Sequence, residues 1–173
     1  MALGHGAGGG IESADLVALT SALAAAGWRV ARIIQPYRVQ GRRAPDRAPK
    51  LDAAFTEVVT ALRADHAPGG RLVLGGRSSG ARVACRTATG LDAAAVVCLA
   101  FPLHPPGRPE SSRADELGLV RVPLLVVQGE RDAFGGPGEL PAGPTVVAVP
   151  GDHSLRTTAP VVAAVVEWLD QLD

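Results

Sequence analysis

The sequence predicts an α/β protein in which a mostly parallel sheet is covered by helices on both faces. Short apolar runs alternate with amphipathic helical patterns along the chain, which is the order expected for strand–helix–strand units. Some runs, such as residues 94–101, are apolar at every position. Strands of this kind are buried on both faces, as in parallel sheets. The 173 residues fit a single domain, residues 1–173, that is long enough to bury a core.

Helices are predicted where apolar residues recur every three or four positions. The first covers residues 13–26 and is followed by Gly27, which favours termination. Pro49 begins the second helix. Its predicted apolar face consists of Leu51, Phe55, Val58 and Leu62. The later helices are expected at residues 79–89, at 112–118, and from Thr157 or Thr158 onward.

Strands are predicted at the apolar runs between these helices. In chain order they are residues 1–4, 28–34, 71–74, 94–101, 122–128 and 146–149. Two long loops separate them from their neighbours. One, rich in Arg, Pro and Gly, covers residues 36–48, and the other, rich in proline, covers residues 102–109.

The composition argues against several classes of function. Lys plus Arg and Asp plus Glu both number 17, so the basic excess typical of nucleic-acid binders is absent. No apolar run reaches the roughly 18 residues that span a membrane, and no secretory signal is seen. Cys85 and Cys98 lie in apolar segments without a C-x-x-C pair, so we expect buried thiols and no metal site. We therefore expect a cytoplasmic protein without a cofactor and without a nucleic-acid or membrane partner.

A nucleophilic serine is predicted between the third strand and the helix that follows it. Gly76, Ser78 and Gly80 satisfy the pattern G-x-S-x-G. A serine forced into this tight turn brings the residues two positions away on either side into contact, and glycines remove the clash. The turn lifts the Ser78 hydroxyl above the carboxyl end of the sheet, beside the start of a helix. Without catalysis, the same residues are a plain glycine-rich turn.

Serine needs a base, and His153 is the strongest candidate. It follows a late strand, so it opens at the edge of the sheet where Ser78 emerges. The base in turn needs a carboxylate, and Asp132 follows the preceding strand. Glu130 is the second choice, because Asp152 is adjacent to the histidine and sequence neighbours rarely face each other.

Attack on a carbonyl also requires donors for the developing oxyanion. The backbone N–H of Ser79 follows the nucleophile and is the first candidate. The second is expected from the glycine-rich loop after the first strand, where we select the N–H of Ala7 or Gly6. In that loop, His5 is expected to support the backbone rather than to perform chemistry.

The same glycines also allow a different interpretation. Gly4, Gly6 and Gly9 match G-x-G-x-x-G, the spacing of dinucleotide-binding loops. Such a loop needs a full strand before it, and only three residues precede Gly4. An NADP-type site, with Arg38 on the 2′-phosphate, is therefore the less favoured alternative. It leaves the serine, aspartate and histidine unexplained.

Six segments together resemble a known family. The chain resembles the dienelactone-hydrolase-like α/β-hydrolases grouped with testis-expressed protein 30 and NSL complex subunit 3, over nearly its whole length. The segments are residues 5–8, 36–45, 75–78, 101–107, 128–132 and 151–154. The stretch Pro-Leu-His-Pro-Pro-Gly at 102–107 is the most specific of them.

The resemblance implies an α/β-hydrolase fold with Ser78 as nucleophile, Asp132 as acid and His153 as base. We expect a serine hydrolase that acts on an ester, thioester or lactone bond of a small acyl substrate. The alternative is a catalytically inactive module that keeps the hydrolase shell for protein interaction, since one eukaryotic branch of the family serves in a chromatin complex.

Four residues are predicted near the substrate. They are His5, Tyr37, Arg77 and His104. With Arg38, Arg42 and Arg43, Arg77 would favour an anionic substrate, although arginines of this kind more often form a solvated face. No insertion is long enough for a lid, so we expect a shallow site.

The chain departs from the family at its start. In this fold the strand before the oxyanion loop is central and two more strands precede it, whereas here only residues 1–4 can form that strand. We expect a fold that lacks the first strands and has an open sheet edge. Such an edge predicts lower stability or a homodimer.

Overall fold

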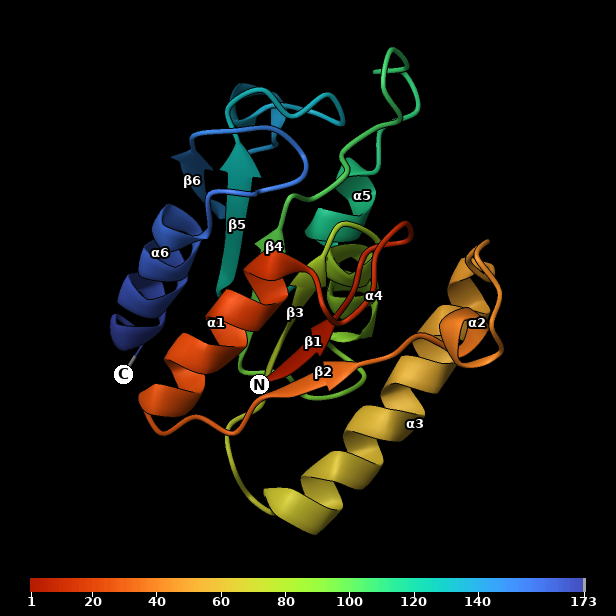
Figure 1. Ribbon diagram of the computed structural model, residues 1–173, viewed down its shortest axis with the longest axis vertical. Coiled ribbons are helices and arrows are strands. Elements are labelled where there is room, and N and C mark those ends of the chain that lie inside the picture. Colours follow the sequence, from red (N-terminus) through yellow and green to blue (C-terminus); the bar gives the residue numbers. More distant parts are fainter. Residues whose placement is uncertain (173) are drawn as a thin grey trace.

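The computed structural model describes residues 1–172 and contains a six-stranded, all-parallel sheet within them (Figure 1). The strand order is β2-β1-β3-β4-β5-β6. The strands are β1 (Ala2–Gly4), β2 (Ala31–Ile33), β3 (Val73–Arg77), β4 (Ala95–Leu99), β5 (Leu124–Gly129) and β6 (Thr145–Val149). The predicted fold class is confirmed, and the sheet is wholly rather than mostly parallel.

Helices cover both faces of the sheet and enclose two apolar cores. Helices α1 (Ala14–Ala25) and α6 (Thr158–Asp170) pack together on one face. The other face carries α3 (Ala48–His66), α4 (Ser79–Thr87) and α5 (Ala114–Gly118). Two short helical segments, α2 (Pro36–Val39) and the 3₁₀ turn η1 (Pro137–Glu139), lie in loops. No helix within residues 1–172 is long and apolar enough to cross a membrane.

The short first strand is central, as predicted. It pairs with β2 on one side and with β3 on the other, and β2 pairs only with β1, which makes β2 an edge strand. Since all strands are parallel, the loops after β1, β3, β5 and β6 leave the sheet at the same edge. This edge carries every residue that was predicted to be catalytic.

Three local predictions are wrong. The second strand covers three residues instead of 28–34, because β1 offers partners only from Ala2 to Gly4. The predicted loop 36–48 contains α2, whose first residue is a proline with the φ angle of a helix start. On α3, Val58 is 40% exposed and Val59 is buried, because the buried face continues at every fourth residue after Leu51 and Phe55.

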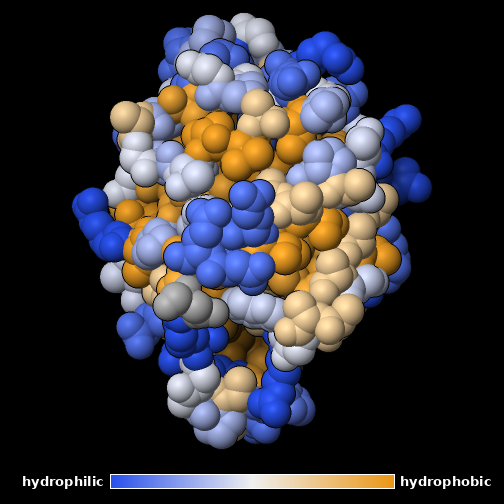
Figure 2. All heavy atoms as spheres, turned by 90° about the vertical axis from the view of Figure 1, so that its left-hand side faces the viewer, coloured by the Kyte–Doolittle hydropathy of each residue, from blue (hydrophilic) through white to orange (hydrophobic). Residues whose placement is uncertain are grey.

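A wide hollow lies at the opposite edge of the sheet from these loops. It measures about 950 Å³ and is lined by residues that precede β1, β2 and β3, together with the end of α3. Figure 2 shows it as a recess with an apolar floor in the lower part of the molecule.

Candidate active site

Ser78 has a strained backbone at the junction of β3 and α4. Its φ is +52° and its ψ is −112°. A non-glycine residue with positive φ is uncommon and costs about 1–3 kcal/mol, so such strain persists only where the surroundings enforce it. This geometry is the one expected when a serine is lifted out of a strand-to-helix turn.

Glycines make the turn sterically feasible. A Cβ atom built on Gly76 would lie 2.6 Å from the carbonyl carbon of Gly80, so the predicted crowding around the serine is confirmed. The same Cβ would lie 2.6 Å from the carbonyl oxygen of Gly4, and a Cβ on Gly80 would overlap that carbonyl group. Gly4 therefore has a packing role at the end of β1, which the dinucleotide-loop interpretation did not anticipate.

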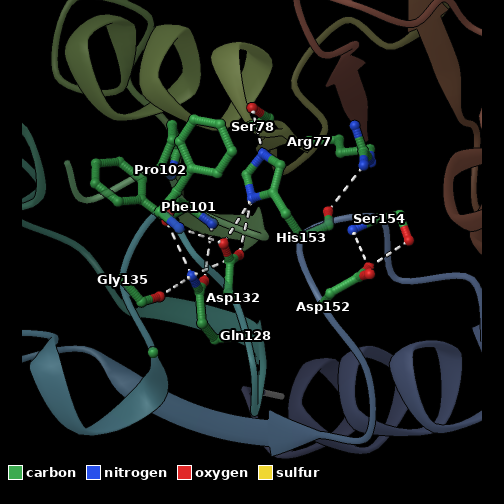
Figure 3. A network of polar contacts seen from close by, with 12 residues as sticks. Arg77, Ser78, Phe101, Pro102, Gln128, Asp132, Gly135, Asp152, His153 and Ser154 are labelled. Carbon is green, nitrogen blue, oxygen red and sulfur yellow. Dashed lines mark hydrogen bonds and ion pairs between the residues drawn. The ribbon is translucent and has the colours of Figure 1, made fainter. Parts of the chain in front are cut away.

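The three predicted side chains meet at the carboxyl edge of the sheet (Figure 3). The Nε2 atom of His153 lies 3.0 Å from Ser78 Oγ, and its Nδ1 atom lies 2.8 Å from Asp132 Oδ2 and 3.0 Å from Oδ1. The residues follow β3, β5 and β6, respectively. The spatial convergence predicted from the sequence is therefore observed, at distances that permit proton transfer.

The two alternative carboxylates lie elsewhere. Glu130 is exposed. Asp152 accepts hydrogen bonds from the Ser154 hydroxyl at 2.5 Å and from its N–H at 2.9 Å, and these bonds lower the pKa of Asp152. Neither residue is hydrogen-bonded to His153 in residues 1–172.

Asp132 is fixed by a buried network that the sequence analysis missed. Gln128, at the end of β5, is fully buried, and its Nε2 lies 3.0 Å from Asp132 Oδ2. The same amide exchanges hydrogen bonds with the backbone of Phe101, at 2.9 and 3.0 Å. The backbone N–H of Phe134 donates to Asp132 Oδ1 at 2.8 Å. The sequence did offer a signal for Gln128, because it is the one polar side chain in the run 124–129.

Phe134 also covers one face of the histidine. Its ring centroid lies 4.2 Å from that of His153, with 31° between the planes. The contact restricts rotation of the imidazole, and no sequence pattern indicated it.

The predicted oxyanion donors are close to the serine. Ser79 is the first residue of α4, so its N–H has no acceptor within the helix. Ala7 lines the same cavity as Ser78, and a Cβ on Gly6 would lie 3.4 Å from Ser78 Cβ. Within residues 1–172, no hydrogen bond uses the N–H of Ala7 or Ser79. Both groups are therefore available to an oxyanion.

His5 and Tyr37 support this loop from behind. The Nε2 atom of His5 accepts the N–H of Gln35 at 3.0 Å, so its Nδ1 carries the proton and donates to the Gly6 carbonyl at 2.8 Å. Burial lowers the pKa of His5, in agreement with a neutral ring. The Tyr37 hydroxyl donates to the Ala7 carbonyl at 3.1 Å. The expectation that His5 supports the loop is confirmed, but neither side chain lines the cavity.

The cavity at Ser78 is open and measures about 600 Å³. Its lining residues are Ala7, Gly8, Gly9, Ser13, Ala14, Asp15, Arg77, Ser78, Phe134, His153, Ser154 and Arg156. Of the four residues predicted near the substrate, Arg77 is the one found in this lining. His104 instead lies beside Glu139, with its Nε2 3.2 Å from the carboxylate. In the loop before α3, Arg42 pairs with Asp46 at 2.8 Å on the exposed surface.

This arrangement suits acyl transfer. The serine has a base within reach, the base has a buried carboxylate on its other nitrogen, and the N–H groups of Ala7 and Ser79 are free near the serine. Within residues 1–172, no cluster of His, Cys, Asp or Glu has the grouping needed to hold a metal ion.

Comparisons with known proteins agree with this geometry. A family model described as an alpha/beta hydrolase domain matches residues 1–161. No curated protein sequence matches the chain. Among solved structures, the chain is similar to an α/β serine hydrolase without a lid from Xanthomonas campestris, with a TM-score of 0.77 and 22% identity over 98% of this chain and 81% of that one.

Two further structures have the same fold. Est1E from Butyrivibrio proteoclasticus, solved with ferulic acid bound, has a TM-score of 0.75 and 18% identity, covering 99% of this chain and 88% of that one. A pyrethroid hydrolase from Sphingobium faniae has a TM-score of 0.71 and 16% identity, covering 98% of this chain and 96% of that one. At these identities the likeness shows the fold, which in this chain matches a hydrolase that lacks a lid.

Proposed function

The chain belongs to the alpha/beta hydrolase family, and from that premise we propose that it is a serine hydrolase of carboxylic esters, thioesters or lactones. The observation that supports this most is the strained Ser78, whose Oγ lies 3.0 Å from a histidine that is itself paired with a buried aspartate. A plain glycine-rich turn requires neither the strain nor the pair.

The reaction follows from these positions. The Nε2 atom of His153 accepts the hydroxyl proton while Ser78 Oγ bonds to the substrate carbonyl carbon, and the carbonyl electrons move to its oxygen. The N–H groups of Ala7 and Ser79 stabilise that oxyanion. Asp132, hydrogen-bonded to Nδ1, stabilises the imidazolium that forms.

The intermediate then collapses and the acyl–oxygen or acyl–sulfur bond breaks. His153 returns its proton to the leaving alcohol or thiol, so an acyl-serine remains. Water, deprotonated by the same histidine, attacks this ester and releases the carboxylic acid, which restores the Ser78 hydroxyl.

The substrate proposed is small. The cavity is open and lined partly by the Phe134 ring and by glycine-loop backbone, which suits an exposed acyl group. Within the family, the segment Pro102–Gly107 supports a dienelactone-hydrolase-like branch. Similarity to a pyrethroid hydrolase and to a protein that binds ferulic acid is compatible with an ester substrate.

A fluorophosphonate probe tests the proposal directly. We expect the wild-type protein to be labelled, the Ser78→Ala variant to lose labelling, and the Ser154→Ala variant to keep it. Ser154 is the matched control because its hydroxyl lines the same cavity but bonds to Asp152. Absence of labelling in well-folded wild-type protein contradicts the proposal and favours the non-catalytic interaction module.

A screen of p-nitrophenyl esters and thioesters then defines the acyl group. In the same screen, the Ser78→Ala variant is expected to lose turnover by about 10⁴-fold or more, because removal of the nucleophile eliminates covalent catalysis.

A further inference from the structure

Arg77 connects three segments of the site. It is the last residue of β3 and directly precedes the serine. Its Nη2 donates to the backbone carbonyl of His153 at 2.8 Å, as Figure 3 shows. Its Nε lies 3.0 Å from Asp15 Oδ2. A Cβ on Gly6 would lie 2.9 Å from Nη1, so the guanidinium also lies against the oxyanion loop.

Asp15 supplies a buried counter-charge for this guanidinium. It belongs to α1 and is 1% exposed. Burial raises the pKa of the Asp15 carboxyl, and the Arg77 charge opposes that shift. Its Oδ1 accepts the N–H of Leu16 at 2.9 Å. Arg77 Nε–H and Asp15 Oδ2 are not aligned as a hydrogen bond, so the contact is an ion pair.

These contacts argue against Arg77 as the binding site for an anionic substrate. The charge of Arg77 is already paired with Asp15, and the Arg77 side chain is only 15% exposed. One of its N–H groups is committed to the loop that carries the histidine. Of the other arginines predicted to assist it, Arg42 is paired with Asp46.

We propose that Arg77 is a positioning residue that fixes the base relative to the nucleophile, with Asp15 holding its guanidinium in place. The proposal rests on the proposed hydrolase function. Arg77 is bonded covalently to Ser78 and by a hydrogen bond to the backbone of His153, so it spans the two partners of the 3.0 Å contact. A displacement of about 1 Å at a catalytic group can cost about 10²-fold in rate.

Steady-state kinetics separate positioning from substrate binding. With p-nitrophenyl acetate, which is neutral, we expect Arg77→Met to lower kcat by about 10- to 100-fold while KM changes little. If Arg77 instead binds substrate anions, kcat for the neutral ester is unchanged and KM rises only for an ester that carries a carboxylate. That result overturns the proposal.

Arg86→Met is the matched control. Arg86 is as buried as Arg77, at 13% side-chain exposure, and pairs with Asp52 and Glu116 away from the cavity. It should lose stability but keep kcat. If Arg77→Met and Arg86→Met lose kcat equally, Arg77 contributes only to the stability of the fold, and the proposal is contradicted. If Arg77→Met does not fold because Asp15 is left unpaired, Arg77→Met with Asp15→Asn provides the same comparison.

Hydrogen exchange supplies a readout that does not depend on activity. We expect amide exchange in residues 151–156 to be faster in Arg77→Met than in the wild type or in Arg86→Met. Unchanged exchange there overturns the positioning role even if the enzyme is active. If the wild type shows no labelling or turnover while the exchange difference is present, the hydrolase proposal fails and the structural link stands.

Discussion

At the scale of single residues, the site depends on groups whose polar atoms are almost all paired. Asp132 accepts from Gln128, Phe134 and the histidine, and each of these partners is itself held by backbone or ring contacts. Because a buried carboxylate is costly when its oxygens are unpaired, these hydrogen bonds stabilise Asp132 in its buried position. The histidine is thereby held with its Nε2 directed at Ser78 Oγ.

His104 gives a prediction of pH dependence. Hydrogen bonding to the Pro105 carbonyl, and then to Glu139, raises the pKa of His104 above its ordinary value. The folded-state pKa is the higher one, so the protonated ring stabilises the fold below the unfolded pKa of about 6.5. That contribution is lost as the pH rises through the folded-state pKa.

We therefore expect His104→Gln to destabilise the protein more at about pH 5.5 than at about pH 8.5. Urea unfolding at the two pH values, with wild-type protein measured alongside, gives the comparison. If His104→Gln lowered the free energy of unfolding equally at both pH values, the imidazole would contribute by packing alone.

The sequence predicted the three residues that meet at the candidate site but not the residues that support them. Ser78, Asp132 and His153 could be selected because each follows a strand and each has a required chemistry. Gln128 and Phe134 carry no such requirement, so their roles depend on side-chain directions that no spacing specifies. The Asp15–Arg77 pair joins residues far apart in the chain, and only the packing of α1 beside β3 brings them together.

At the scale of elements, the contact between β1 and α4 positions Ser78. Gly4 and Gly80 approach so closely that no side chain fits between them. The sequence analysis explained Gly80 by crowding within the turn alone, because the neighbouring strand is known only from the sheet order. The strand and helix positions themselves were largely predictable. The runs of β4 and β5 are almost continuously apolar, and the leucines of α1 recur with a helical period.

We expect Gly80→Ala to destabilise the protein by about 2–3 kcal/mol, because the added methyl meets rigid backbone and α4 must move away from β1. The Gly118→Ala variant is the control. Gly118 ends α5 and a Cβ there meets nothing within 4 Å, so it should be neutral or slightly stabilising. Denaturant unfolding measures both, and equal stabilities for the two variants would contradict the predicted clash.

At the scale of the whole molecule, the outer strand β2 and the strand that precedes Ser78, β3, are different strands, with β1 between them. The sheet has two outer strands, β2 and β6, and on β2 the Ala31 N–H donates back to the Met1 carbonyl. Since backbone groups alternate in direction along a strand, the N–H and C=O of Arg32 point outward. Exposed apolar side chains, Ile34 and Val39, follow this strand.

We propose that this edge pairs with a second copy of the chain and expect a concentration-dependent dimer by size exclusion with light scattering. Arg32→Pro removes the outward donor and should give a monomer, whereas Arg32→Ala keeps the backbone and should still dimerise. A wild-type protein that stays monomeric at all concentrations contradicts the proposal. The catalytic variants do not depend on that outcome, because Ser78 follows β3, which is separated from β2 by β1 in the sheet.

The close approach of Gly4 to Gly80 also limits how the candidate site can be redesigned. The two proposed donors, on Ala7 and Ser79, belong to the same two chain segments as Gly4 and Gly80, whose main chains no side chain separates, so we expect the spacing of the donors to depend on this backbone contact. We expect point substitutions to reshape the walls of the cavity more readily than to change that spacing. A larger or differently charged intermediate would have to be accommodated by inserting or deleting residues in the segment between Gly4 and Ser13.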